Sequence, residues 1–297
     1  MVIRIKMLCN WTDSKSLCQE WKVMCEHDYQ WNELEITWED KDIDYYVIIN
    51  FPPEDAFYIP EKTIVFQMEP TCAVKHWGEW SNPDPKKFMH VGSHKNHLNT
   101  VQVQFKKIPQ LISSTRLDKA MIILSGKAFD PGHIKRINLV QRDAGRLIDI
   151  FGRENYHNLD GYISALPNDN KENMMVSYKY CFQAENNSER NYATEKIWEP
   201  IICECLCFYW GCPNLEDYID ANSFVRLDLN NIEESLSIIN TAIKEDWWLQ
   251  RLPSIRATKK KILDELAFFP RIKDIINQKI NKLYYNNEYR FIFRSPR

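Results

Sequence analysis

The chain has 297 residues, 38 basic and 41 acidic side chains and a formal net charge of −3, and 44% of its residues are hydrophobic. These values exclude a wholly disordered chain, and the near-neutral charge argues against non-specific nucleic-acid binding, which needs a basic surface. Only 8 residues are glycine. No two glycines have the spacing of a glycine-rich phosphate loop, so a bound nucleotide would have its phosphates held by side chains.

The first part of the chain contains continuous apolar runs separated by helix-length segments. We predict strands at residues 2–8, 34–38, 45–49, 63–68 and 101–105. A helix at 17–24 is predicted to be capped by the polar residues just before it. Residues 72–99 show no regular pattern, and 106–119 is predicted to be a connection. Apolar runs of this kind fit a parallel sheet that is covered on both faces.

A second series of strands and helices follows the connection. We predict strands at 121–124, 147–151, 178–182, 206–210 and 224–227. We predict helices at 133–147, 194–204, 231–244 and 255–266. The chain is therefore expected to form two α/β domains, at 1–115 and 116–266, and a helical, basic C-terminal segment at 267–297 that packs back on the first domain.

Nine cysteines are present, and Cys203, Cys205 and Cys207 form a C-x-C-x-C pattern. Without a CxxC pair, buried free thiols are a better interpretation than a metal site. The N-terminus has no apolar segment of signal-peptide length, and no run of 18 apolar residues exists, so a cytoplasmic protein without a membrane span is expected. Basic residues gather toward the C-terminus at 259–261 and at Arg290, Arg294 and Arg297. They are interpreted as a solvated tail, with peripheral contact to a membrane surface as the alternative.

The densest polar cluster, residues 183–196, lies between a predicted strand and a predicted helix. Ligands bind at this edge of open α/β sheets. Thr194 can cap the helix, and Glu195 and Lys196 fall in its first turn, where unpaired backbone N–H groups favour an anion. A lysine there opposes the helix dipole, which is explained if a phosphate shares the site. The alternative is a solvated loop before a capped helix.

Three segments of this region carry a resemblance to a known family. They read YKYCFQAENN at 178–187, YATEKI at 192–197 and FYWGCP at 208–213. Together they resemble the donor-binding motif of glycosyltransferase family ten, the α1,3/α1,4-fucosyltransferases. The chain departs from the family pattern at Ala184, Asn187 and Cys207, where the family has Phe, Ser and Pro.

The resemblance implies a GT-B fold, in which two Rossmann-like domains face each other across a cleft. It also implies an inverting transfer of L-fucose from GDP-L-fucose to a GlcNAc- or Glc-containing glycan, in an α1,3-type linkage. The first domain would then bind the acceptor and the second the donor. No cofactor is required, although a divalent cation could stimulate the reaction.

The resemblance further implies roles for individual residues. Glu69, in VFQMEP at 65–70, would be the catalytic base that takes the proton of the acceptor hydroxyl. Arg136 and Lys196 would hold the diphosphate; Lys135 and Arg142 are neighbours to which the first of these roles could shift. The donor-binding residues expected in total are Ser125, Lys127, Arg136, Glu185, Asn186, Tyr192, Glu195 and Lys196.

Other features allow further interpretations. His90, His94 and His97 would share one face of a helix and could bind zinc, but acceptor-cleft or surface histidines are preferred, and no metal site is predicted. Asp42 and Asp44 form a D-x-D pattern, which is interpreted as a solvated entry to a strand. Three residues are expected in the acceptor region: Trp77, Trp80 and His94.

Two alternatives to a fucosyltransferase stay open. Ala184 and Asn187 could shift specificity toward another nucleotide-activated deoxysugar, because small changes near a sugar pocket alter selectivity. The chain could also be a non-catalytic module that binds a glycan or a nucleotide. The retained charged residues, Glu69 and Lys196 among them, argue against that last alternative.

Overall fold

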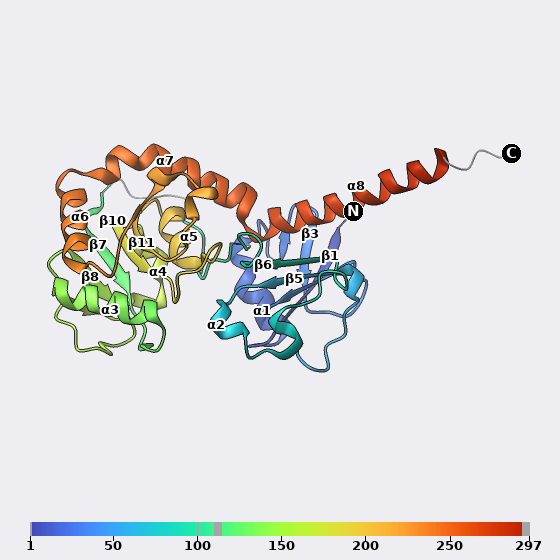
Figure 1. Cartoon of the computed structure of the whole chain (residues 1–297), viewed down its shortest axis with the longest axis horizontal. Coiled ribbons are helices and arrows are strands. Elements are labelled where there is room, and N and C mark those ends of the chain that lie inside the picture. The colour runs from blue at the N-terminus through green and yellow to red at the C-terminus, as the bar shows by residue number, and fades with distance from the viewer. Residues whose placement is uncertain (1, 100, 110–114, 293–297) are drawn as a thin grey trace.

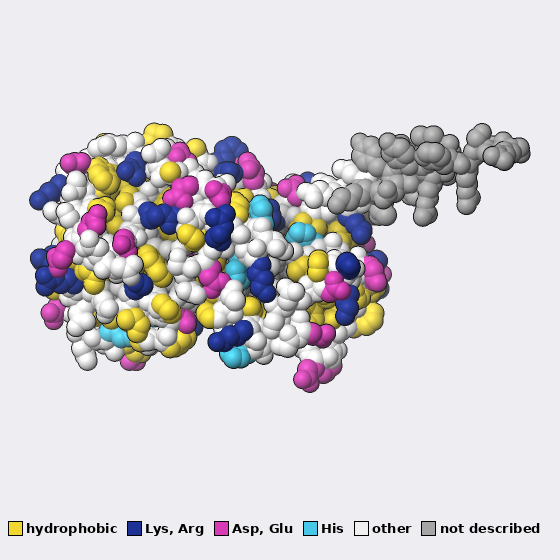
Figure 2. Space-filling model, in the orientation of Figure 1, with side chains coloured by type: hydrophobic (Ala, Val, Ile, Leu, Met, Phe, Trp, Pro, Cys, Tyr) yellow, Lys and Arg dark blue, Asp and Glu magenta, His cyan; other side chains and the backbone are white. Residues whose placement is uncertain are grey.

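The computed structural model describes residues 2–99, 101–109 and 115–292 and contains two six-stranded sheets. The sheets form the centres of two α/β units that lie side by side (Figure 1). On the face in Figure 2, basic and acidic side chains are interspersed over both units. This arrangement is the predicted pair of α/β domains.

The first sheet has the strand order β2-β3-β1-β4-β5-β6 and is parallel except at β2. Its strands are β1 (Ile3–Cys9), β2 (Gln30–Trp31), β3 (Leu34–Thr37), β4 (Tyr45–Ile49), β5 (Thr63–Gln67) and β6 (His90–Ser93). The central strands consist of continuous apolar runs because both of their faces are buried. Strands β2 and β3 lie on one side of β1, and β4, β5 and β6 lie on the other, so the strand order reverses between β1 and β4.

The second sheet is wholly parallel and has the order β12-β11-β10-β7-β8-β9. Its strands are β7 (Leu117–Ile123), β8 (Ile148–Phe151), β9 (Tyr162–Ser164), β10 (Tyr178–Ala184), β11 (Leu206–Trp210) and β12 (Phe224–Arg226). Counted within this unit, the order is that of a Rossmann fold. The strand order reverses between β7 and β10, which is where such folds bind their ligands.

Helices cover the sheets. They are α1 (Ser14–Trp21), α2 (Thr71–Val74), α3 (Pro131–Asp143), α4 (Lys171–Met175), α5 (Glu195–Ile202), α6 (Ile232–Lys244), α7 (Trp247–Lys261) and α8 (Phe268–Ile292). The α1 helix begins at Ser14, three residues before the predicted start, because the carboxylate of Asp13 accepts hydrogen bonds from two backbone N–H groups of its first turn.

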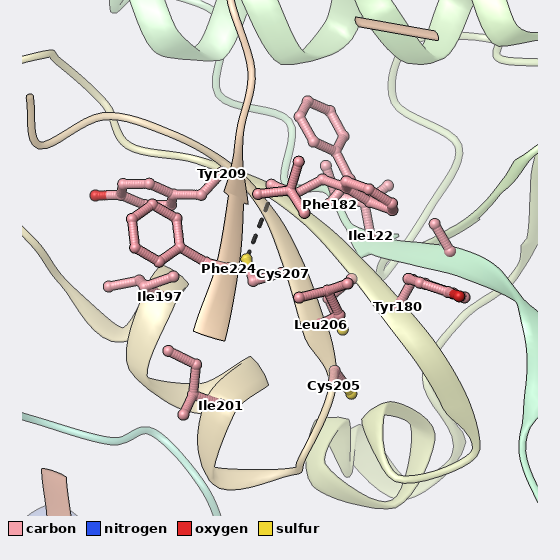
Figure 3. Packing of buried hydrophobic residues seen from close by; sticks show 14 of the residues in the cluster. Ile122, Tyr180, Phe182, Ile197, Ile201, Cys205, Leu206, Cys207, Tyr209 and Phe224 are labelled. Atoms are coloured by element: carbon pink, nitrogen blue, oxygen red, sulfur yellow. Dashed lines mark hydrogen bonds between the residues drawn. The ribbon is translucent and has the colours of Figure 1, made fainter. Parts of the chain in front are cut away.

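The core of the second unit is built around β10 and β11. Tyr180 stacks on Phe208 with ring centroids 5.5 Å apart. In Figure 3, Ile197 of α5 lies next to Phe224 of β12, and Cys207 lies within the cluster of buried apolar side chains. All nine cysteines are free, and no group of three His, Cys, Asp or Glu side chains in the described part of the chain could hold a metal ion.

The chain passes between the units twice. After α7 and a π-helical turn (Ile262–Leu266), α8 returns to the first unit (Figure 1). Its residues Phe268, Phe269 and Ile272 belong to the core of that unit. The other crossing, at 101–105, is not the strand that the apolar alternation predicts. Val101 makes one bridge to Ala267, and the alternating residues are apolar because they pack on the core of the second unit.

Several other elements differ from the prediction. The irregular segment 72–99 contains most of α2, a 3₁₀ turn (Gly78–Ser81) and β6. His90 lies on β6, so the three histidines do not share a helix face. The predicted helix at 17–24 ends as α-helix at Trp21 and continues as a 3₁₀ turn. The connection is shorter than expected, because β7 begins at Leu117, and residues 110–114 of it lie outside the described residues.

In the described ranges, no helix is long and apolar enough to cross a membrane. The basic side chains at 259–261 have partners within the chain. Lys259 pairs with Glu204 at 3.2 Å, Lys260 pairs with Asp264, and Lys261 donates to a backbone carbonyl. Arg294 and Arg297, which belong to the predicted basic tail, lie outside the described residues.

Candidate active site

A cavity of about 610 Å³ lies between the two units, at the carboxyl ends of β5, β7 and β10. On the side of the second sheet it opens at the point where the strand order reverses. The loops after β7 and β10 both contribute to it. The predicted site residues that line this cavity are Glu69, Ser125, Lys127, Arg136, Asn186, Tyr192, Glu195 and Lys196.

Arg136 is the arginine of α3 that faces the cavity. It is buried, its Nε atom has no hydrogen-bond partner, and it pairs with no carboxylate among the described residues. Burial lowers its pKa, although the carboxylates of Glu185 and Glu195 oppose the shift. Its two neighbours point elsewhere, because Lys135 bonds to Asn230 and Arg142 pairs with Glu233. A buried guanidinium with free donors is suited to an anionic ligand.

Gly132 allows α3 to approach this position. Its N–H donates to the carbonyl oxygen of Asn186 at 3.0 Å, so the first turn of α3 touches the loop after β10. A Cβ atom at Gly132 would lie 1.7 Å from the carbonyl oxygen of Glu185. Any larger residue would therefore push the helix, and with it Arg136, away from the loop.

Lys196 lies in the first turn of α5, where Thr194 forms the N-cap. Its Nζ atom is 3.0 Å from a carboxylate oxygen of Glu195 and 3.5 Å from one of Glu185. Burial raises the pKa of Glu195, but the ammonium groups of Lys196 and Lys171 outweigh this effect and bring the pKa to about 2. Burial lowers the pKa of Lys196, and Glu195 and Glu185 more than reverse that shift. The site thus holds a charged lysine next to a charged glutamate.

Glu185, which is predicted to bind the donor, is not among the residues that line the cavity. It is fully buried beneath the loop and accepts from Thr194 at N (2.8 Å) and at Oγ1 (2.6 Å), and from the hydroxyl of Tyr209 at 3.2 Å. A Cβ atom at Gly211 would lie 2.4 Å from its Cγ atom. These contacts tie Glu185 to the start of α5 and to Lys196, and its donor-binding role stays a prediction.

Glu69 follows β5 and faces the same cavity from the first unit. Burial raises its pKa, and the positive charges of Lys196 and Lys127 oppose the shift only in part. Its backbone is held through the preceding residue, because Met68 N donates to Asn50 Oδ1 at 2.9 Å. A carboxylate with a raised pKa can accept a proton near neutral pH.

Tyr192 and Lys127 supply further hydrogen-bond donors. Tyr192 is buried, and burial, together with the charges of Glu185 and Glu69, raises its pKa, so its phenol stays protonated. Lys127 and Ser125 lie on the exposed loop after β7, where Lys127 N donates to Ser125 Oγ at 3.4 Å. These groups surround the space that Arg136 faces.

The three residues predicted for the acceptor region do not line the cavity. Trp77 packs against Phe51, and Trp80 packs against Phe88 in a small apolar cluster of the first unit. His94 is buried between the units. Trp77 and Trp80 were predicted from their aromatic character and their closeness in sequence to Glu69, and both signals are equally compatible with packing.

His94 instead belongs to a contact between the two units. Its Nε2 atom lies 3.1 Å from Glu189 Oε2 and 3.1 Å from Thr71 Oγ1, and its carbonyl oxygen accepts from Asn191 at 2.8 Å. Thr71 N also donates to Glu189 at 3.1 Å. Tyr192 follows Asn191 directly and its ring lies 5.8 Å from that of His94. This contact holds the two walls of the cavity together next to the predicted donor residues.

Sequence reasoning missed several cavity residues. Lys171 of α4 and Glu199 of α5 form a buried ion pair at 2.6 Å, and burial raises the pKa of Glu199 to about 7, although Lys171 opposes the shift. Tyr156, whose ring packs on Gly126, lines the same space. Glu199 lies four residues after Glu195, so helical periodicity could have found it. Nothing in the sequence marks Tyr156.

The positions at which the chain departs from the family pattern lie next to residues of the cavity, since Arg136 donates to the carbonyl oxygen of Ala184 at 3.5 Å and Asn187 follows Asn186. Ala184 and Cys207 are buried in β10 and β11. Asn187 donates to Glu189 at 2.8 Å and accepts from Ser188 N at 2.9 Å. None of the three lines the cavity. Another nucleotide-activated deoxysugar as the donor therefore stays an open alternative.

Comparisons with known proteins agree with this geometry at the level of the fold. No protein-family model matches the chain. A solved α1,3-fucosyltransferase superposes with a TM-score of 0.52 at 15% identity, covering 90% of this chain and 91% of that one. An α-glucosyltransferase solved with UDP and DNA gives 0.54 at 12% identity, over 93% and 100%. The fold is that of these GT-B enzymes.

Similarity to curated sequences is local. GDP-fucose protein O-fucosyltransferase 3 of Xenopus laevis is 35% identical over 49 residues, which are 16% of this chain and 10% of that protein. The protein of the same name from Gallus gallus is 30% identical over 59 residues, 20% of this chain and 12% of that protein. The match thus spans about a tenth of the length of these relatives.

Proposed function

We propose that this protein is an inverting glycosyltransferase that moves L-fucose from GDP-L-fucose to a hydroxyl group of a GlcNAc- or Glc-containing glycan. One observation carries the proposal. Glu69 of the first unit and the cations Arg136 and Lys196 of the second line a single cavity. The similarity to solved α1,3-fucosyltransferases and to GDP-fucose transferases supports the choice of donor.

The reaction follows from the charges. Glu69 takes the proton from the acceptor hydroxyl as its oxygen forms a bond to the anomeric carbon of fucose. The bond from that carbon to the diphosphate oxygen breaks, and the electron pair leaves with GDP. Arg136, Lys127 and Lys196 stabilise the growing negative charge, and Tyr192 can donate a hydrogen bond to it. Attack from the side opposite the leaving group inverts the anomeric centre.

These protein cations occupy the role that a divalent metal has in other glycosyl transfers, so we propose that no metal is required. Lys196 can bind the diphosphate if a phosphate oxygen replaces the carboxylate of Glu195 as the partner of its ammonium group. A bound phosphate would compete with that carboxylate for the ammonium group, while Glu195 could turn to hydroxyl groups of the sugar or ribose.

A panel of nucleotide sugars tests the proposal. The purified protein is incubated with GDP-fucose, GDP-mannose, UDP-glucose and dTDP-rhamnose, with and without N-acetyllactosamine, and release of the nucleotide and transfer of the sugar are measured. We expect release and transfer with GDP-fucose alone, also in the presence of EDTA. Turnover restricted to a UDP- or dTDP-sugar would contradict the donor assignment, and saturable GDP-fucose binding without turnover would indicate a binding module.

A further inference from the structure

A second cavity of about 480 Å³ lies between the first unit and the crossing segment 101–105, and it meets the first cavity at Glu69. Four residues line both cavities: Met68, Glu69, Gln102 and Gln104. Its volume lies within the roughly 300–1,000 Å³ of small-molecule sites. A group bound in the second cavity would therefore reach the same carboxylate as a group bound in the first.

The position of this second cavity follows from the topology of the first sheet. Trp11 lies in the loop after β1, and Asn50 is the residue that follows β4. The strand order of the first sheet reverses between β1 and β4. The crevice at the carboxyl ends of such a strand pair is a ligand site in open α/β sheets. The second cavity is thus the counterpart, in the first unit, of the crevice that Arg136 faces in the second.

The chemistry of the lining selects a class of ligand. The second cavity has no lysine or arginine in its lining, whereas carboxylates and amides are contributed by Glu20, Glu69, Asn50, Gln102 and Gln104. An anionic ligand would find no counter-charge there. A neutral polyhydroxyl compound would find acceptors and donors for its hydroxyl groups.

Trp11 provides an apolar platform beside these polar groups. Trp11 is 44% exposed. Its Nε1 atom donates a hydrogen bond to Glu20 Oε2 at 3.3 Å. The hydrogen bond fixes one edge of the indole ring and leaves much of its surface to solvent. A large, rigid, half-exposed aromatic ring of this kind is suited to stack on the apolar face of a sugar.

We propose that the second cavity is the acceptor site and that it takes a neutral saccharide, stacked on Trp11 and hydrogen bonded to Glu20, with its reacting hydroxyl directed at Glu69. This inference rests on the proposed function and deepens it. It replaces the acceptor region expected around Trp77 and Trp80 with one on the other side of Glu69.

The test measures saccharide binding and transfer separately. Saturation-transfer NMR detects binding of N-acetyllactosamine, lactose and 3′-sialyl-N-acetyllactosamine to the full chain with GDP present. Steady-state transfer from GDP-fucose gives KM and kcat for N-acetyllactosamine. The variants are Trp11→Ala, the conservative Trp11→Phe and Glu20→Gln, and Trp77→Ala represents the competing location. Circular dichroism and thermal unfolding verify that each variant is folded.

We expect a KM for N-acetyllactosamine raised about ten-fold in Trp11→Ala and partly restored in Trp11→Phe, with GDP affinity and GDP-fucose hydrolysis unchanged. Glu20→Gln should raise the same KM, and Trp77→Ala should not. The proposal is overturned if neither neutral saccharide binds the wild type, if the sialylated one binds more tightly, or if Trp77→Ala and not Trp11→Ala loses the NMR signal. Failure of the proposed function would look different, because saccharide binding would still depend on Trp11 while no nucleotide sugar turned over.

Discussion

Glu69 is half-buried at the place where the two cavities meet, and the proposed reaction needs it as a proton acceptor. Glu69→Gln keeps the shape of the side chain and removes its basicity. We expect transfer to fall roughly 10²- to 10⁴-fold. GDP affinity should stay the same, because Glu69 forms no hydrogen bond or ion pair with Arg136 or Lys196, the side chains predicted to hold the diphosphate. Transfer assays and calorimetry measure the two effects.

Glu61→Gln, an exposed substitution in the same unit, is the matched control for this variant and should behave as wild type. Retention of most of the activity by Glu69→Gln would remove the proposed base. A large loss of GDP affinity would instead place Glu69 in the donor site.

Burial raises the pKa of Glu69, and this predicts the acid side of the pH profile. Only the ionised carboxylate can accept a proton, so kcat/KM should be lost as the pH falls through that raised pKa and should level off above it. Glu199, whose pKa is raised to about 7, lines the same cavity and could add a second step. The profile is therefore measured for wild type and for Glu199→Gln. An acid limb that disappears in Glu199→Gln would show that Glu69 is not the titrating group.

At the scale of the elements, the approach of α3 to the loop after β10 determines where Arg136 lies. Gly132→Ala places a Cβ atom against backbone that cannot move away cheaply. We expect a loss of stability on the order of 3 kcal/mol and weaker GDP binding. Chemical denaturation and calorimetry measure them. The matched substitution is Gly126→Ala, which meets only the ring of Tyr156 at 3.1 Å. Equal, small effects of both substitutions would show that α3 is not held by this contact.

The elements also show what a sequence can predict. The central strands were recognisable because burial on both faces requires an uninterrupted apolar run, as in Tyr45–Ile49. The same rule produced an error at 101–105, where the apolar residues belong to a crossing segment that packs on the second unit without strand partners. A buried segment has the same apolar pattern in the sequence whether or not neighbouring strands form hydrogen bonds with it.

The candidate site was predictable to the extent that it is local. Thr194, Glu195 and Lys196 form one helix turn after one strand, and their spacing alone brings them together. The sequence could not reveal that Glu185 is buried beneath that turn. It also could not show that Trp11, more than fifty residues before Glu69, shares a cavity with it. Such proximity depends on strand order, which apolar runs do not encode.

At the scale of the whole molecule, the contact of His94 with Glu189 joins the two units. Burial and the charge of Lys95 lower the pKa of His94, although Glu189 opposes this shift. Burial raises the pKa of Glu189, but hydrogen bonds from Thr71 more than reverse that shift, so the pKa of Glu189 is lowered. His94 contributes stability that is lost as the pH falls below its unfolded value of about 6.5. Glu189 contributes stability that is present above about 4.5 and lost at lower pH.

We therefore expect Glu189→Gln to unfold at a lower temperature than wild type at neutral pH, with a cost on the order of 1–2 kcal/mol. It should also lose more stability than wild type as the pH falls to about 4.5, because the carboxylate that favours protonated His94 is gone. Thermal unfolding between pH 4 and pH 7.5 measures this. Glu54→Gln, at an exposed position of the first unit, is the control and should follow wild type. A Glu189→Gln curve parallel to that of wild type at every pH would contradict the role of this contact.

The central claim is that the cavity between the units binds a nucleoside diphosphate through side chains. The most direct measurement is a calorimetric titration of GDP into wild type, Arg136→Met and Arg142→Met. Arg136 and Arg142 lie on the same helix, but only Arg136 faces the cavity. We predict that wild type and Arg142→Met bind GDP equally and that Arg136→Met binds it at least about ten-fold more weakly. GDP affinity that is absent in wild type, or equal in all three proteins, would contradict the account.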